Sequence, residues 1–241
     1  MRPPRRLTPE HMDDPHASRE DLAVALRYLR TINARLGGTT AALRQFERWA
    51  QDWPRNGAPV RILDVGTGSA DIPLAIARWA RAAGHRVHIT AVDLHPVTCD
   101  LARAYLREHG GNGGGADVDI VQGDALRLTD MFESGSFDYA HAGLFLHHLQ
   151  DIEVMTVLRI MDRLAGRGVI WNDLVRVRFP RTMLAPFLIG APAIVRHDAI
   201  VSVQAGFTKA EAIDLAQRAG WHKARWRRHL VHRFTLVTTK S

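Results

Sequence analysis

The chain has 241 residues, of which 46% are hydrophobic and 24% are charged, which suits a single globular domain with additions and a sizeable core. The only cysteine is Cys99, which excludes an internal disulfide and fits a reducing cytoplasm. No stretch is long and apolar enough for a membrane-spanning helix, and the basic N-terminus lacks the apolar region of a signal peptide. We therefore expect a cytoplasmic protein.

The formal net charge of +7 raises the question of a nucleic-acid partner. Basic residues gather near the two ends of the chain, at Arg2, Arg5 and Arg6 and again between Lys223 and Arg233. No RNA-binding module accompanies them. We interpret the excess charge as a solvated tail and an arginine-rich last pair of strands, with an RNA partner as the alternative.

Residues 1–57 are predicted to form a tail followed by a helical cover. The first 17 residues show no periodicity and are expected to be irregular. A capping-box pattern begins at Ser18, and apolar residues then recur at helical spacing until Gly37. A second helix, capped by Thr39 or Thr40, should follow. Such helices could cover a substrate or merely pack on the next domain, and the sequence does not distinguish these roles.

From residue 58 to residue 241 the pattern alternates between strands and helices, which is typical of an α/β fold with a Rossmann-like, doubly wound sheet. Seven strands are expected, at 60–65, 87–93, 118–121, 136–141, 167–172, 222–227 and 230–238. Helices are expected at 71–83, 96–109 and 151–164, and another should open at the capping box of Thr208 and Glu211. The apolar, proline-punctuated stretch at about 176–207 interrupts the alternation and predicts a helical lid insertion.

A glycine turn follows the first strand of this domain. Gly66 and Gly68 break the apolar run, and Asp71 opens the next helix. A turn of this kind lets a ligand approach the backbone at the carboxyl edge of a parallel sheet. A dinucleotide fingerprint would place a third glycine where Asp71 stands, and a carboxylate there repels phosphate but suits an ammonium group. The turn therefore predicts a nucleoside that carries an amino acid.

Acidic residues also follow the next two strands. Asp93 ends the second strand about 25 residues after Gly68, where a carboxylate accepts hydrogen bonds from ribose hydroxyls. A helix N-cap before Pro96 is the alternative role for Asp93. Asp124 follows the third strand, and an ordinary Asx turn is its alternative role.

Together these residues resemble the first motifs of the class I S-adenosylmethionine-dependent methyltransferases, over roughly residues 60 to 174. The resemblance implies S-adenosyl-L-methionine as cofactor, with Asp124 at the adenine amino group and the Ala125 amide at a ring nitrogen. For Asp64 two roles are open: contact with the cofactor's amino group through water, or fixing the turn. The cofactor-binding set is then Asp64, Gly66, Thr67, Gly68, Asp71, Asp93, Leu94, Asp124 and Ala125.

Three histidines are candidate catalytic bases. His147 and His148 follow the fourth strand, whose carboxyl end should face the reacting methyl group. In the family that the chain resembles, a histidine pair here accompanies many substrates, which favours an orienting role instead. His197 stands beside Asp198, which could orient it as an acid–base pair, and a salt-bridged corner of the lid is the alternative.

Several reactions are disfavoured by what is missing. The Asp/Asn-Pro-Pro-Tyr tetrapeptide of amino-methylating enzymes is absent, and Cys99 is misplaced for a cytosine C5 mechanism. Asn172 and Asp173 could be two ligands of a metal, but the segment from His141 to His148 offers no acidic partner. We therefore expect no metal.

The apolar lid suggests a small lipophilic or aromatic methyl acceptor, bound by Phe145, Met183, Phe187 and Arg196. The layout resembles methyltransferases of ubiquinone and menaquinone biosynthesis and of polyketide natural-product pathways. We expect O-methylation of a phenol or polyketide-type hydroxyl. C-methylation of an aromatic ring, RNA methylation and a cofactor-binding module without catalysis are the alternatives. Contact with a membrane surface and the oligomeric state stay open.

Overall fold

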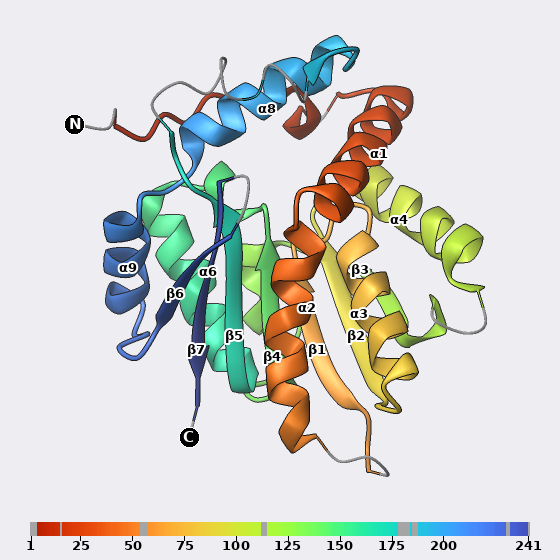
Figure 1. Cartoon of the computed structure of the whole chain (residues 1–241), viewed down its shortest axis with the longest axis vertical. Coiled ribbons are helices and arrows are strands. Elements are labelled where there is room, and N and C mark those ends of the chain that lie inside the picture. The colour runs from red at the N-terminus through yellow and green to blue at the C-terminus, as the bar shows by residue number, and fades with distance from the viewer. Residues whose placement is uncertain are drawn as a thin grey trace.

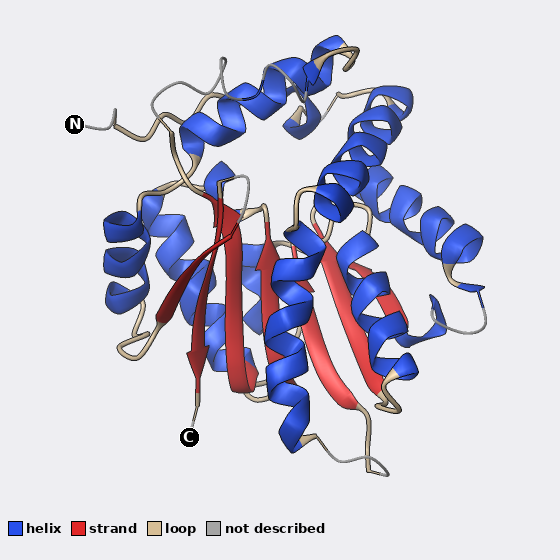
Figure 2. Ribbon diagram, viewed as in Figure 1, coloured by secondary structure: helices blue, strands red, loops and turns tan. Residues whose placement is uncertain are grey.

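The computed structural model describes residues 4–14, 16–53, 57–111, 115–177, 184, 188–229 and 232–240. They form a seven-stranded sheet with helices on both faces (Figures 1 and 2), in the strand order β3-β2-β1-β4-β5-β7-β6. The strands are β1 (Val60–Val65), β2 (Val87–Asp93), β3 (Val118–Gln122), β4 (Phe137–Gly143), β5 (Ala165–Leu174), β6 (Arg225–His229) and β7 (Arg233–Thr239). The first five run parallel, and β7 lies antiparallel between β5 and β6. The predicted doubly wound sheet is confirmed.

The helices divide between the two faces of the sheet. They are α1 (Arg19–Arg35), α2 (Gly38–Trp49), α3 (Asp71–Ala82), α4 (Pro96–His109), α6 (Asp151–Leu164), α8 (Ala193–Ala205) and α9 (Lys209–Arg218). Apolar residues of α2, α3 and α4 share one buried cluster with β1 and β2, and those of α6 and α9 share another with β4 and β5. Burying both faces explains why the central strands are almost continuously apolar rather than alternating.

Most predicted element boundaries hold, and the exceptions have local causes. The last two strands begin three residues later than the predicted 222 and 230, because Trp221 is anchored by a hydrogen bond to Leu158 O and His232 occupies a left-handed turn with φ 56°. Helix α2 begins at Gly38, not after a threonine cap. Gly37, with φ 83°, turns the chain sharply between α1 and α2, so Thr39 and Thr40 lie inside the helix.

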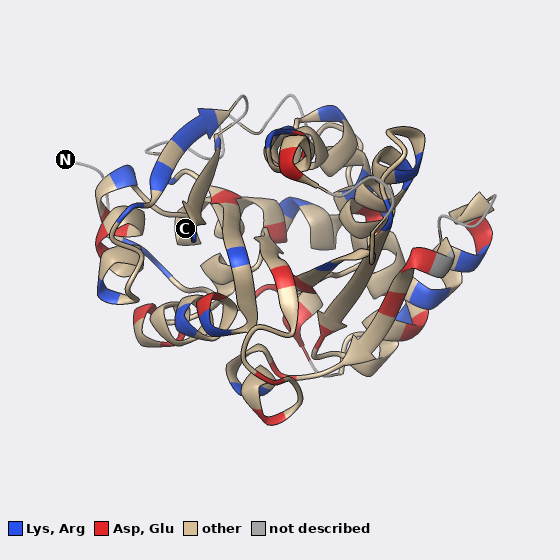
Figure 3. Ribbon diagram, turned by 90° about the horizontal axis from the view of Figure 1, so that it is seen from below, with Lys and Arg blue, Asp and Glu red and all other residues tan. Residues whose placement is uncertain are grey.

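The basic residues near the C-terminal end are not one surface group. Arg225, Arg227 and Arg228 are exposed on β6, the edge strand of the sheet, where like charges discourage pairing with another strand (Figure 3). Arg233 differs, because it is only 1% exposed at the start of β7. Arg233 thus belongs to the arginine-rich last pair of strands, as predicted, but its side chain is buried.

The N-terminal segment, residues 4–14, is irregular as predicted apart from the short helix η1 (His11–Asp13), but it is not a free tail. It runs beside α8 above the carboxyl ends of the parallel strands (Figure 1). The Arg5 side chain donates to Leu149 O, His147 O and Ala205 O at 2.7, 2.9 and 2.8 Å. Arg5 thereby ties the segment to both the β4–α6 loop and the end of α8.

The described part of the predicted lid consists mainly of α8. Its apolar residues Val195 and Val203 pack with Leu184, Leu188 and Ala191 in a small separate cluster. Met183 and Phe187, two predicted acceptor contacts, lie outside the described residues. Within the described residues, no helix combines the length and the hydrophobicity that crossing a membrane requires.

Candidate active site

A cavity of about 970 Å³ lies at the carboxyl ends of β1, β2, β4 and β5. Parallel α/β sheets bind ligands at this edge, where the strand order reverses between β1 and β4. The cavity is closed from the other side by α1, α8 and the N-terminal segment, all of which contribute lining residues. The three predicted acidic contacts Asp71, Asp93 and Asp124 all line it.

The glycine turn after β1 forms one wall of the cavity. Gly66 and Gly68 have φ values of 68° and 55°, a region that side chains rarely adopt. A Cβ atom on Gly66 would lie 2.4 Å from the Phe145 ring, so this position also requires the absence of a side chain. Thr67 is buried between them and lines the cavity as well. The turn therefore exposes backbone to a ligand, as predicted.

Asp93 fixes the turn from the neighbouring strand. Its two carboxylate oxygens accept hydrogen bonds from Gly68 N at 2.9 Å and from His95 N at 3.1 Å. Burial raises the pKa of Asp93, although these hydrogen bonds oppose the shift. Each carboxylate oxygen has a further lone pair, so Asp93 can hold the turn and accept hydroxyl donors together.

Asp71 sits at the start of α3, deep in the cavity wall. Its carboxylate accepts from Ser69 Oγ at 2.9 Å and from Asn33 Nδ2 at 3.1 Å. Burial raises the pKa of Asp71 despite both hydrogen bonds. A partly buried carboxylate that forms no ion pair with the described residues is well suited to a ligand's ammonium group. Asn33 comes from α1 and was not predicted as a site residue.

The third acidic residue, Asp124, caps the short helix η4 (Ala125–Asp130), accepting from Leu126 N at 2.9 Å. The Asx-type hydrogen bond is therefore present, and the side chain also lines the cavity beside Ala125. Leu94 lines the rim and is 65% exposed.

Asp64 is placed differently from the other predicted contacts. It is buried, its carboxylate lies 2.5 Å from His141 Nδ1, and it is not among the described residues that line the cavity. This position beneath the turn fits the structural alternative.

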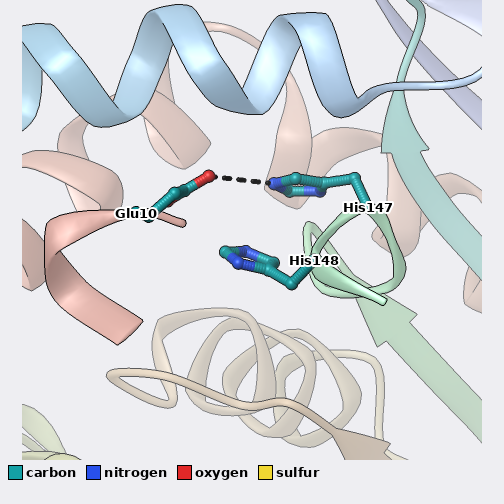
Figure 4. Close-up of side chains that lie close together, drawn as sticks. All are labelled: Glu10, His147 and His148. Carbon is teal, nitrogen blue, oxygen red and sulfur yellow. Dashed lines mark ion pairs between the residues drawn. The ribbon is translucent and has the colours of Figure 1, made fainter. Parts of the chain in front are cut away.

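His147 and His148 lie on the short helix η5 (Leu146–His148) at the far end of the same cavity, near the N-terminal residue Glu10 (Figure 4). His147 is almost fully buried, with Nδ1 2.7 Å from Asp173 and Nε2 3.6 Å from Glu10. Burial alone would disfavour the imidazolium, but Asp173 and then Glu10 overcome this and raise the pKa of His147 to about 10. His147 is therefore protonated at neutral pH and cannot accept a further proton.

His148 has a separate carboxylate partner. Its Nδ1 lies 2.6 Å from Asp13 of η1, and its side chain is partly exposed. Because a carboxylate only accepts hydrogen bonds, Nδ1 carries a proton, and Nε2 is the ring nitrogen that can accept one in the neutral tautomer. Phe145, a predicted acceptor contact, lines the cavity beside this histidine.

His197 and Asp198 do form the predicted pair, with His197 Nδ1 3.0 Å from Asp198 Oδ1. Asp198 also accepts from His11 N at 2.9 Å and from Met12 N at 3.2 Å, so it holds the N-terminal segment on α8. His197 and Arg196 are not among the described residues that line the cavity, and Arg196 is exposed. The placement fits the structural alternative for this pair.

Two groups of side chains bring potential metal ligands together, Glu10 with His147 and His148, and His11 with His197 and Asp198. In each group the ligand atoms lie within 4.8 Å of one another. In the first group, Asp173 and Glu10 raise the pKa of His147, so a metal would have to displace a proton from this imidazole.

The lining residues that were not predicted as site residues include Glu10, Asp13, Asn33 and Arg233. Glu10 and Asp13 stand in a stretch without periodicity, so the sequence carried no signal for them. Asn33 and Arg233 did carry one, because each is a polar residue within an otherwise apolar helix face or strand.

A family model described as a methyltransferase domain matches residues 62–168. No curated protein matches the sequence. Solved structures match over most of the chain. PigF with SAH is 21% identical with a TM-score of 0.67, over 96% of this chain and 63% of that one. A Nostoc punctiforme protein assigned as an O-methyltransferase is 16% identical with a TM-score of 0.66, over 97% of this chain and 64% of that one.

A third similar structure is the CMeT domain of the citrinin polyketide synthase, which is 13% identical with a TM-score of 0.63. The match covers 83% of this chain and 51% of the CMeT domain chain. This chain thus spans only about half to two thirds of these three proteins. Residues 62–168 therefore match a methyltransferase domain, and the fold of the chain is similar to that of PigF.

Proposed function

We propose that the protein is an S-adenosylmethionine-dependent methyltransferase that methylates a hydroxyl group of a small lipophilic or aromatic acceptor. The observation that carries this proposal is one cavity that is lined both by the glycine turn with its acidic residues and by the His148–Asp13 pair.

Three acidic residues in the cavity wall offer a partner to each of three parts of S-adenosylmethionine. Asp71 would bind the ammonium group, Asp93 the ribose hydroxyls and Asp124 the adenine amino group. The similarity in fold to PigF, solved with SAH, supports the same cofactor, since SAH is its demethylated form. When bound, the cofactor would supply an electrophilic methyl group on its sulfonium, which an acceptor oxygen can attack in line as the bond from the methyl carbon to sulfur breaks and the thioether SAH leaves.

The acceptor half of the cavity is largely apolar. Its wall includes side chains from α1, α8 and the β4–α6 loop, namely Leu29, Ile32, Phe145, Leu149, Val195 and Val203. Such a wall excludes water and gains free energy by covering an apolar or aromatic molecule. The chain mainly has to align the acceptor and keep water away.

A hydroxyl must lose its proton as it becomes methylated, and His148 is placed to accept it. The proton passes from the acceptor oxygen to His148 Nε2, while Asp13 at Nδ1 stabilises the resulting imidazolium. His147 does not compete for the proton, because it is already charged. Its role in this proposal is to position η5 between Asp173 and Glu10.

The two alternatives for the acceptor have unequal support. C-methylation is kept as the second candidate, since the CMeT domain has a similar fold. RNA methylation is disfavoured because the exposed arginines of β6 are not among the described residues that line the cavity.

Methyl transfer from labelled S-adenosylmethionine to a panel of phenols, quinols and polyketide-type hydroxyls tests the proposal. We expect an O-methylated product, identified by mass spectrometry, with wild type and none with an Asp93→Ala control. Label on a ring carbon would establish C-methylation instead. Cofactor binding without incorporation into any small molecule or RNA would mean a binding module.

A further inference from the structure

Arg233 is a buried cation in the wall of the cavity. It opens β7, is 1% exposed, and is the one lysine or arginine among the described lining residues. Burial lowers the pKa of Arg233 to about 10, with Asp173 and Asp71 opposing the shift, so the guanidinium stays charged at neutral pH. The methyl-transfer chemistry proposed above does not use this charge.

The guanidinium is only partly satisfied by the described protein. Arg233 Nη2 donates to Asn33 Oδ1 at 2.9 Å. Nη1 is buried and has no hydrogen-bond partner among the described residues. A buried, charged N–H group without an acceptor is destabilising, and such groups are normally paired. Among the described residues, this N–H group is therefore left available for an anionic acceptor.

Asn33 connects this arginine to Asp71. Its amide oxygen accepts from Arg233, and its amide nitrogen donates to Asp71 Oδ2 at 3.1 Å. One amide thus separates a cation from an anion along the cavity wall. Gly38 packs directly against this pair, since a Cβ there would lie 2.6 Å from Arg233 Nη1 and 2.7 Å from Asn33 Oδ1. The arrangement leaves the guanidinium little freedom to move elsewhere.

The cation Arg233 and the anion Asp71 lie on the two sides of the Asn33 amide, and this spacing suits the two charged groups of an α-amino acid. An amino acid carries its carboxylate and its ammonium group on a single carbon, so its two partners must be a cation and an anion held close together. We propose that Arg233 Nη1 binds the α-carboxylate of the cofactor's amino-acid moiety, while Asn33 sets the spacing to Asp71, which binds the ammonium group. This inference rests on the proposed cofactor but not on the acceptor or the base.

Binding of two ligands that differ only in this carboxylate tests the inference. S-adenosylmethionine and its decarboxylated analogue are titrated by calorimetry into wild type, Arg233→Met and Arg233→Lys. We expect Arg233→Met to weaken S-adenosylmethionine binding by about 10- to 100-fold and to leave the decarboxylated analogue nearly unchanged. Arg233→Lys should recover part of the affinity. Arg228→Met on the exposed face of β6 is the matched control and should change neither ligand.

Two further measurements keep the test decisive if Arg233→Met is unstable. Binding of 5′-methylthioadenosine, which lacks the whole amino-acid end, reports whether the nucleoside half is still folded. Asn33→Ala should show the same selectivity for the carboxylate with a smaller loss. Equal losses for both ligands with 5′-methylthioadenosine binding intact would overturn the inference.

The carboxylate could also come from the acceptor. In that case Arg233→Met would leave S-adenosylmethionine affinity unchanged and raise the KM of a carboxylated acceptor, which likewise contradicts the inference. Failure to methylate any hydroxyl would refute the proposed reaction and leave this binding result intact.

Discussion

The imidazole of His148 lies 2.6 Å from the carboxylate of Asp13, a residue 135 positions earlier in the chain. A histidine held in this way has its Nε2 lone pair fixed in direction, which is what a general base needs. The N-terminal segment is thus part of the candidate site rather than an appendage to it.

His148→Ala should lower kcat by about 100-fold or more, in the range for loss of a general base, with S-adenosylmethionine affinity unchanged. Asp13→Asn should lower kcat less, because the base survives without its charged partner. Steady-state kinetics over a range of pH, with calorimetry of the cofactor, would measure both. His197→Ala is the matched control and should keep most of the activity, and a full rate in His148→Ala would remove His148 as the base.

The charge of His147 predicts how stability depends on alkaline pH. Its folded pKa of about 10 lies above the ordinary value of about 6.5, so the folded state binds this proton more tightly. The stabilisation is complete below about pH 6.5 and is lost as pH rises towards 10, by at most about 1.4 kcal/mol per pH unit. Urea unfolding of wild type and His147→Gln at several pH values would measure it. The difference between the two proteins should shrink as pH rises, and a constant difference would contradict the assignment.

Asp93→Ala should weaken binding of S-adenosylmethionine by about 10- to 100-fold, because it removes the ribose acceptor and also releases Gly68 N. Calorimetry gives the affinity directly. Asp124→Ala provides a comparison at the adenine end, where we expect a smaller loss. Unchanged affinity in Asp93→Ala would refute the ribose assignment.

Gly66→Ala should impair cofactor binding more than the small size of the added methyl group suggests. The new methyl group would meet the Phe145 ring at 2.4 Å, in a backbone region unfavourable for alanine. Thermal unfolding and cofactor titration would separate loss of stability from loss of binding. Gly135→Ala is a suitable control for strain alone, because Gly135 has φ 71° with nothing within 4 Å of the added carbon.

Activity should survive prolonged treatment with a chelator, because the proposed reaction uses a histidine base and no metal. Assays before and after treatment with EDTA, followed by addition of Mg²⁺ or Zn²⁺, would test this. Loss of activity that returns with one of these ions would show that a metal takes part.

The fold was largely predictable because its signals are local. The apolar run of β1, the glycine turn, the N-cap at Ser18 and the capping box at Thr208 each act over a few residues, and each is present in the structure. The positions of Asp71 and Asp93 follow from the same local signals, since Asp71 opens α3 after the glycine turn and Asp93 ends β2.

The acceptor half could not be predicted in the same way. Glu10 and Asp13 reach the histidines only because the N-terminal segment folds back over the sheet, and nothing in their neighbourhood indicates this. Conversely, His197 and Asp198 are adjacent in sequence and look like an acid–base pair. Tertiary packing instead turns Asp198 towards the backbone of the N-terminal segment.

The docking of residues 5–13 across the cavity has a consequence for the order of events in a turnover. The same short segment covers the acceptor end and carries the partner of His148. Lifting it to admit a molecule would separate Asp13 from the histidine, and lowering it would rejoin them. Displacement of residues 5–13 would therefore also remove the carboxylate partner of His148. His148 would then accept a proton efficiently only when the segment covers the bound hydroxyl.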